Sequence, residues 1–204
     1  MNTRTPLQAL SLIGLLTAQG CASLSVGQDV QSGRNALQTG RSSEAVSFLA
    51  RAAAQDPNYT LPYRMREGVL TYLGRAYYET GRDADARATL EKALAKDKDD
   101  HLASLYLGLT LVRMGERERG AKELQSGLRG IHELLDYLAS DNFSGIFWDP
   151  NRMIRNDIKT ALEQKTASPE MIAAAQRVGS LVDREIDKAR INEGRLRYDP
   201  LVDN

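Results

Sequence analysis

Small and apolar residues recur along the middle of the chain at nearly constant intervals. Glycines at 33, 74 and 108 are each followed seven residues later by another glycine, and nine residues after that by a leucine. The second and third copies start 34 residues apart and the first two start 41 apart, which places about seven extra residues near Asn58–Arg64. A regular period of this length predicts a stack of repeated supersecondary units.

Each copy of the pattern predicts two helices of about a dozen residues, joined by a short turn. Gly40, Gly81 and Gly115 stand where the first helix must end, because glycine tolerates the left-handed backbone found there. The small residues at 33, 74 and 108 let the two helices approach closely, and leucines fill the core between them. These leucines are Leu49, Leu90 and Leu124. Since one helix pair cannot bury its apolar face alone, the pairs must stack.

The segment Tyr72–Gly81, together with Ala93 and Leu94, resembles the tetratricopeptide repeat (TPR) family at nearly every consensus position. The repeat set covers roughly residues 28–130. This resemblance implies an all-α fold, a short right-handed TPR-like helical-hairpin solenoid with C-terminal capping helices. It also implies a non-catalytic surface that binds other proteins.

In TPR domains, residues at the positions of Arg34, Arg75, Tyr78 and Arg113 line a concave groove. The same analogy places Leu105 and Leu109 on that face. The resemblance therefore implies a partner-binding groove for a peptide backbone, a carboxylate or an acidic segment. The alternative is that these polar side chains form an ordinary solvated face.

Helical patterns continue after the last repeat. Its second helix is expected to extend to about Ala139, and Asp149-Pro150 is expected to open a helix that ends near Lys165. A further helix is expected over 169–191, with one apolar face and a polar face. The polar face carries Arg177, Asp183, Arg184 and Lys188. We expect this last helix to fold back over the concave face as a cap, the alternative being a partner's helix.

An aromatic cluster falls in the loop expected between these helices. Phe143, Phe147 and Trp148 could form a hook that binds a partner, since aromatic side chains anchor interfaces well. The alternative is a loop pinned into the end of the solenoid.

The first twenty residues have the features of a secretory signal: Arg4 is the only charge before Asp29, and a short apolar run covers 9–16. That run is far shorter than the ~20 residues that span a membrane. With Gly20-Cys21, the segment resembles bacterial lipoprotein precursors, although Ala18 and Gln19 depart from their pattern. The resemblance implies acyl chains on Cys21 and a lipid anchor on the periplasmic side of the cell outer membrane. The alternative is a buried or free thiol at Cys21.

These patterns divide the chain into five parts. They are a signal peptide (1–20), a lipidated linker (21–28), a TPR-like domain (29–139), a helical cap (140–194) and a tail (195–204). Lysine plus arginine and aspartate plus glutamate number 27 each, so no basic excess points to nucleic acid. One cysteine and two histidines exclude a disulfide scaffold and argue against a metal cluster.

The sequence carries no Gly-rich phosphate loop, nucleophile elbow or positioned catalytic set. We therefore expect no enzymatic activity, no cofactor and no metal. The leading hypothesis is a membrane-anchored adaptor or scaffold that recruits another cell-envelope protein or peptide. A second hypothesis is an accessory protein for envelope assembly or transport that binds a small ligand between solenoid and cap. A third is an envelope enzyme with an unrecognised site.

Overall fold

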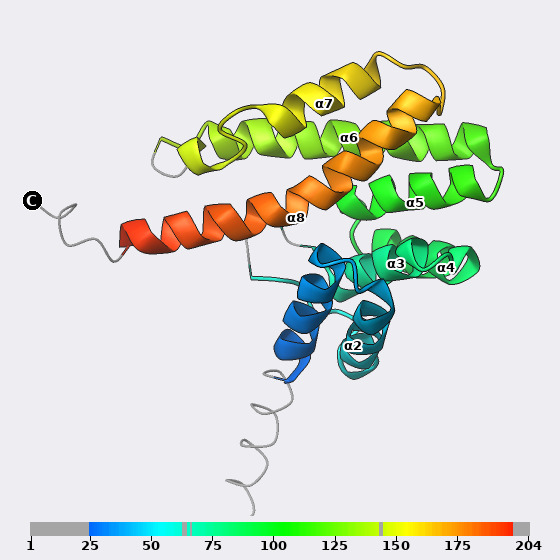
Figure 1. Cartoon of the computed structure of the whole chain (residues 1–204), viewed down its shortest axis with the longest axis horizontal. Helices are drawn as coiled ribbons and strands as arrows, with labels where there is room; N and C mark the ends of the chain where they lie inside the picture. The colour runs from blue at the N-terminus through cyan, green and yellow to red at the C-terminus, as the bar shows by residue number, and fades with distance from the viewer. Residues whose placement is uncertain (1–24, 63–64, 66, 143–144, 198–204) are drawn as a thin grey trace, which may run out of the picture.

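The computed structural model describes residues 25–62, 65, 67–142 and 145–197, and the predicted all-α solenoid is confirmed there (Figure 1). Six helices form three consecutive hairpins. They are the first helix (25–38), α2 (Ser42–Gln55), α3 (Val69–Glu79), α4 (Asp83–Lys96), α5 (His101–Arg113) and α6 (Arg117–Ala139). Their order and lengths follow the repeat pattern, and α6 ends where the sequence predicts.

The turn inside each hairpin is made by the expected glycine. Gly40 and Gly81 both have φ of 74°, and Gly115 has φ of 91°. A side chain at such a φ is strained, so glycine is the residue that ends each first helix without a steric cost. The sequence interpretation of these three positions is confirmed.

Within each hairpin, the other repeated glycine packs against the repeated leucine. A Cβ atom built on Gly74 would lie 2.5 Å from the Cγ of Leu90, and one on Gly33 would lie 2.5 Å from the Cγ of Leu49. In the third hairpin a Cβ on Gly108 would lie 2.6 Å from the backbone nitrogen of Leu124. Close approach of the paired helices therefore depends on the missing side chain.

The carboxyl-terminal part continues with the short helix η1 (Gly145–Phe147), then α7 (Met153–Leu162) and α8 (Pro169–Arg197). Figure 1 shows α8 crossing in front of the α5–α6 hairpin and passing above α3 and the first helix. Side chains of α8 bond to Gln38, Tyr72 and Tyr78 on the first helices of two hairpins. The expected internal cap is therefore confirmed, and α8 extends past the end expected for it.

The turn before α7 differs from the sequence prediction. The helix begins at Met153, not at Asp149-Pro150, because Asp149 (φ 46°) and Arg152 (φ 56°) adopt left-handed conformations that interrupt a helix. The Asp149 carboxylate still accepts hydrogen bonds from the backbone N–H groups of Ile154 and Arg155, at 3.1 Å each. It thus caps α7 from several residues upstream.

Several residues singled out in the sequence fall outside the part of the chain that the structure describes. Cys21, the signal segment, Phe143 and residues 198–204 lie outside the described residues. Residues 25–28, which the sequence assigns to the linker, are helical, and residues 21–24 lie outside the described residues. Among the described residues, no helix is both long enough and apolar enough to cross a membrane.

The glycine–leucine contact can be tested in the second hairpin. Gly74→Ala should lower the free energy of unfolding, although alanine favours helix over glycine by about 1 kcal/mol, because the new methyl group collides with Leu90. The measurement is urea unfolding of Gly74→Ala, Leu90→Ala and the double variant. The double variant should be more stable than the sum of the single losses predicts. Strictly additive losses, or a more stable Gly74→Ala, would contradict the packing.

Candidate functional site

A buried carboxylate joins α8 to the repeat stack. Asp183 of α8 accepts a hydrogen bond from the Tyr72 hydroxyl at 2.9 Å and forms an ion pair with Arg75. The Arg34 guanidinium from the first helix lies 3.5 Å from the same carboxylate. The side chains of Asp183 and Arg34 are fully buried, and that of Arg75 is 3% exposed. We call Arg34, Tyr72, Arg75 and Asp183 the Asp183 clamp.

Neighbouring groups extend the clamp toward both ends of α8. Asp187 lies 3.1 Å from Arg34 and accepts a hydrogen bond from Gln38 at 2.8 Å. Arg75 also pairs with Glu79 at 2.7 Å. Toward the start of α8, Gln176 donates a hydrogen bond of 2.9 Å to the Tyr78 hydroxyl. Polar contacts thus run along the part of the concave face that α8 crosses.

The aromatic rings of the repeats support the arginine side chains. Arg34 lies 5.4 Å from the centre of the Tyr72 ring, and Arg75 lies 5.4 Å from the centre of the Tyr106 ring. Desolvation lowers the pKa of Arg34, but the nearby Tyr72, Asp183 and Asp187 outweigh it and raise that pKa above its usual range. Both clamp arginines are therefore positively charged when they meet Asp183.

The expected groove residues make contacts within the chain itself. Arg34 and Arg75 both form ion pairs with Asp183. Tyr78 is 8% exposed and accepts a hydrogen bond from Gln176. Arg113 stacks on the Tyr78 ring at 3.9 Å and pairs with Asp83. Arg34, Arg75 and Tyr78 therefore face α8 and not a partner, because α8 occupies this part of the groove. Arg113 is exposed, and its place in a partner-binding groove stays a prediction.

The two leucines assigned to the groove are also buried. Leu105 is 0% exposed and Leu109 is 2% exposed. A Cβ atom on Gly127 would lie 2.6 Å from the backbone nitrogen of Leu105. This side of α5 therefore packs against α6, so Leu105 belongs to the hairpin core.

The aromatic cluster after α6 is largely a structural anchor. Trp148 is 2% exposed, and Phe147 is half-buried against the core. The hook hypothesis is therefore wrong for Trp148, and the alternative of a pinned loop agrees with the burial of this segment. The exposed side chain here is Ile146, at 71%.

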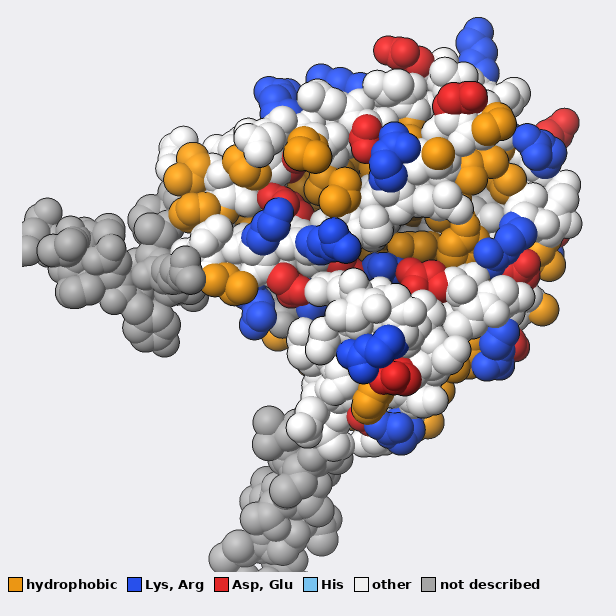
Figure 2. All heavy atoms as spheres, viewed as in Figure 1, with side chains coloured by type: hydrophobic (Ala, Val, Ile, Leu, Met, Phe, Trp, Pro, Cys, Tyr) orange, Lys and Arg blue, Asp and Glu red, His pale blue; other side chains and the backbone are white. Residues whose placement is uncertain are grey.

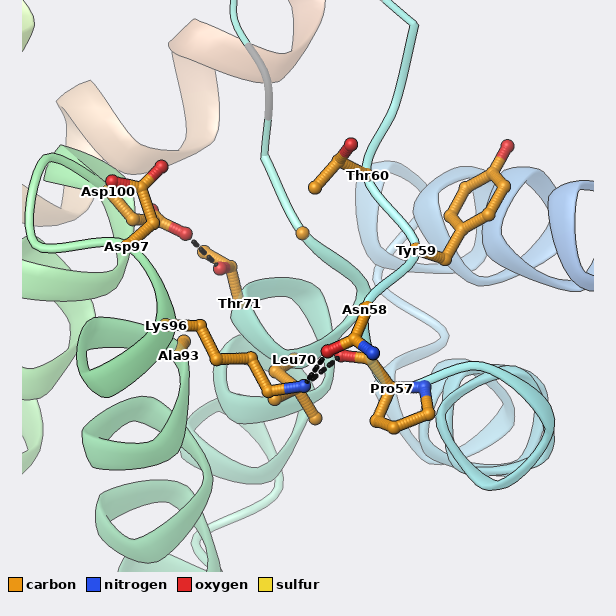
Figure 3. A pocket seen from close by; sticks show the side chains of 11 residues that line it. Pro57, Asn58, Tyr59, Thr60, Leu70, Thr71, Ala93, Lys96, Asp97 and Asp100 are labelled. Carbon is orange, nitrogen blue, oxygen red and sulfur yellow. Dashed lines mark hydrogen bonds between the residues drawn. The ribbon is translucent and has the colours of Figure 1, made fainter.

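The extra residues between the first two repeats build a cavity of about 220 Å³. Figure 3 shows Pro57–Thr60 on one side and Thr71, Asp97 and Asp100 on the other. The Lys96 ammonium reaches across and donates to the Pro57 carbonyl at 2.9 Å and to the Asn58 side chain. The Thr71 hydroxyl donates to Asp100, so polar groups line both walls. We call this space the inserted-loop cavity.

A buried glutamate lies just after the inserted segment. Glu67 is 4% exposed, and its Oε2 has no hydrogen-bond partner among the described residues. Burial raises the pKa of Glu67 to about 8, and the charges of Asp183 and Asp100 add to this effect. Near neutral pH the carboxyl is therefore mostly protonated, so it does not repel Asp183 in the clamp.

Two clamp residues, Tyr72 and Asp183, escaped the sequence analysis as site residues, and so did Tyr106, whose ring lies against Arg75. Tyr72 and Tyr106 stand 34 residues apart, so the repeat period could have marked them as equivalent positions facing the same side. Asp183 was assigned to a polar face, yet it is fully buried. No periodic signal separates it from the exposed charges beside it. The described residues contain no group of three or more His, Cys, Asp or Glu side chains placed to hold a metal ion.

Comparison with known proteins supports the repeat assignment for part of the chain. A family model described as tetratricopeptide repeat matches residues 36–109, from the end of the first helix into α5. No curated protein and no solved structure matches the chain. Repeats of this kind generally mediate protein–protein interactions and typically serve as non-catalytic scaffolds. The resemblance seen in the sequence is thus confirmed over this segment.

Removal of one clamp arginine should destabilise the whole fold. Arg75→Ala leaves Asp183 buried without its closest cation, which should cost about 3–5 kcal/mol of unfolding free energy. Adding Asp183→Ala should recover part of this loss. The partly exposed pair of Arg113 with Asp83 offers a control. Arg113→Ala should lower the free energy of unfolding by at most about 1 kcal/mol. Urea unfolding in which Arg75→Ala behaves like Arg113→Ala would contradict a buried clamp.

Glu67 predicts a specific pH dependence of stability. Its pKa is about 8 in the folded chain and 4.5 ordinarily, so the folded state retains a proton that the unfolded state releases. Stability contributed by this group is therefore complete below about pH 4.5 and falls as the pH rises to about 8. Glu67→Gln should melt like the parent chain near pH 4.5 and several degrees higher near pH 8. Parallel melting curves across this pH range would exclude a buried, proton-retaining Glu67.

Proposed function

We propose that this chain is a membrane-tethered interaction scaffold of the bacterial cell envelope, and that its partner protein binds at the inserted-loop cavity. The observation that carries the proposal is that α8 covers the concave face, where its Asp183 forms ion pairs with Arg34 and Arg75. A partner must then use another surface. The scaffold role itself follows from the repeat stack and from the family match.

The inserted-loop cavity has three properties that suit a partner segment. It is built by residues that interrupt the repeat period, and such connecting segments commonly carry binding residues on a rigid scaffold. Its walls offer both apolar surface, from Pro57 and Leu70, and polar groups from Lys96 and Asp97. Its volume of about 220 Å³ is below the ~300–1,000 Å³ of usual small-molecule pockets. The cavity is therefore too small to enclose a drug-sized ligand, but it can receive a side chain of a partner protein that docks over it.

The tether is proposed from the amino-terminal sequence. Gly20-Cys21 follows a short apolar run, as in lipoprotein precursors, and acylation of Cys21 by two or more chains would anchor the chain stably. Because residue 25 is already helical, at most three residues separate Cys21 from the fold. The scaffold would therefore lie close to the membrane, on the periplasmic side of the outer membrane.

The second hypothesis, a small ligand between solenoid and cap, has weaker support. It needs an apolar cavity under α8, yet several contacts between α8 and the hairpins ahead of α5 are ion pairs and hydrogen bonds. These include Arg75 with Asp183, Arg34 with Asp187 and Gln176 with Tyr78. Burying an apolar molecule among these charges would cost their hydrogen bonds.

The proposal can be tested by crosslinking in living cells. A photoreactive amino acid placed at Thr60, an exposed residue that lines the inserted-loop cavity, should give a covalent adduct with one envelope protein. The matched control is the same amino acid at Lys92, an exposed residue on α4 that does not line the cavity. The adduct is identified by mass spectrometry.

The same cells test the tether. In Cys21→Ser, the chain should lose incorporation of labelled fatty acid and leave the membrane fraction, and the Thr60 adduct should weaken because the scaffold is no longer held near its partner. An adduct that is equally strong at Lys92, or the absence of any adduct at Thr60, would contradict the cavity as the partner site. A Cys21→Ser chain that stays acylated and membrane-bound would contradict the tether.

A further inference from the structure

Exposed aliphatic side chains gather at the end of the cap. Ile146 is 71% exposed, Met153 is 60% exposed and Ile191 is 49% exposed. Ile146 and Met153 line a hollow of about 200 Å³, which they share with Arg184 and Lys188 of α8. Ile191 follows these two cations at helical spacing on the same face of α8. Figure 2 shows hydrophobic and basic side chains, with some acidic ones between them, over η1 and the carboxyl-terminal half of α8.

The charge exposed at this surface is positive, although the chain as a whole has no net charge. The Lys188 side chain is 70% exposed, and Arg152 and Arg184 are exposed as well. Two acids that line the hollow are turned inward, whereas Asp136, near Arg152, is 46% exposed and pairs with Arg155. Glu185 is 10% exposed and accepts a hydrogen bond from the Asp149 backbone at 2.7 Å, and Asp149 itself pairs with Arg155. We call Ile146, Arg152, Met153, Arg184, Lys188 and Ile191 the basic–apolar patch.

The backbone beneath the patch is fixed in place. Asp149 and Arg152 both have positive φ, and Asp149 binds α7 through two backbone N–H groups and α8 through Glu185. Trp148 is buried in the core beside them. Non-glycine residues keep such conformations only when their surroundings impose them. The turn therefore holds Ile146 and Met153 outward as part of a firm surface.

We propose that the basic–apolar patch rests on the surface of an anionic phospholipid membrane. Exposed aliphatic side chains flanked by lysine and arginine are the composition of interfacial membrane-binding surfaces. Protein interfaces differ, because their energetic centres favour tryptophan, tyrosine and arginine and are depleted of lysine. Here Trp148 is buried, and Lys188 is 70% exposed.

This inference deepens the proposed function and rests on its membrane tether. A lipid on Cys21 would restrict the chain to the membrane surface but would leave its orientation free. Contact through the basic–apolar patch would turn one end of the cap toward the headgroups. The scaffold would then present its remaining surfaces in a defined direction to other envelope proteins.

Vesicle co-sedimentation tests the patch without the tether. The chain is used from residue 22 onward, which removes the acylation site and retains every described contact, since these lie within 25–197. Vesicles of phosphatidylcholine with and without phosphatidylglycerol are compared. We expect binding to the anionic vesicles only, weakened by salt and by Arg184→Glu/Lys188→Glu, with about a fivefold loss for each cation removed. Ile146→Ser/Met153→Ser should also weaken it.

Matched controls separate the patch from general effects. Lys92→Glu/Lys98→Glu makes the same charge change on and beside α4, and Met114→Ser removes an exposed methionine that is 40% exposed at the α5–α6 turn. Both controls should bind anionic vesicles like the parent chain. Equal binding to neutral vesicles, no binding at all, or equal losses in the control variants would overturn the inference. So would patch variants that keep vesicle binding but lose the Thr60 adduct, which would indicate a protein interface.

The two proposals fail independently. The vesicle experiment contains no acylated chain and no partner protein, so a negative result leaves the crosslinking experiment unaffected. Conversely, a Cys21→Ser chain that still incorporates labelled fatty acid would refute the lipid tether while leaving the vesicle result as it stands.

Discussion

The arrangement of this molecule depends on one buried carboxylate. Asp183 lies between Arg34, Arg75 and Tyr72, which belong to the first helices of two successive hairpins. A fully buried carboxylate is tolerated only where cations and hydroxyl groups replace the water that it loses. The position of α8 over the concave face is therefore fixed by the repeats, and the clamp joins the cap and the solenoid into one body.

The clamp changes which surfaces are available for function. In an open repeat stack, the arginines and tyrosines of the first helices would face solvent and could bind an acidic partner. Here the chain supplies that acid itself, so the concave face is a structural interface. The two surfaces that we propose for binding lie where the regular pattern is broken. One such place is the inserted-loop cavity, and the other is the basic–apolar patch beyond the pinned Trp148.

Regular features of the fold could be predicted from the sequence because repetition amplifies weak signals. Gly40, Gly81 and Gly115 each give a modest indication of a turn, but their constant distance from the other repeated glycine and the repeated leucine predicts the hairpins. The same argument could have paired Tyr72 with Tyr106. Interactions that occur once could not be predicted in this way. Asp183 looks like any charged residue on an amphipathic helix, and the burial of Glu67 depends on a loop whose path no local pattern defines.

Two of the four clamp residues were accordingly predicted as site residues, but their role was not. Arg34 and Arg75 were correctly placed on the concave side, yet their partner is α8. The left-handed turn at Asp149 and Arg152 was missed because Asp-Pro is a typical helix start, and only the tertiary contacts of Asp149 with Glu185 and Arg155 show why α7 begins later.

Native-state hydrogen exchange tests the central claim most directly. If the clamp makes α8 an integral part of the stack, amides of α8 around Asp183 should exchange with the same opening free energy as those of α3 and α5, in one cooperative unit. If α8 amides exchange far faster while α3 and α5 stay protected, the cap is a loosely attached helix and the account of a closed concave face is wrong.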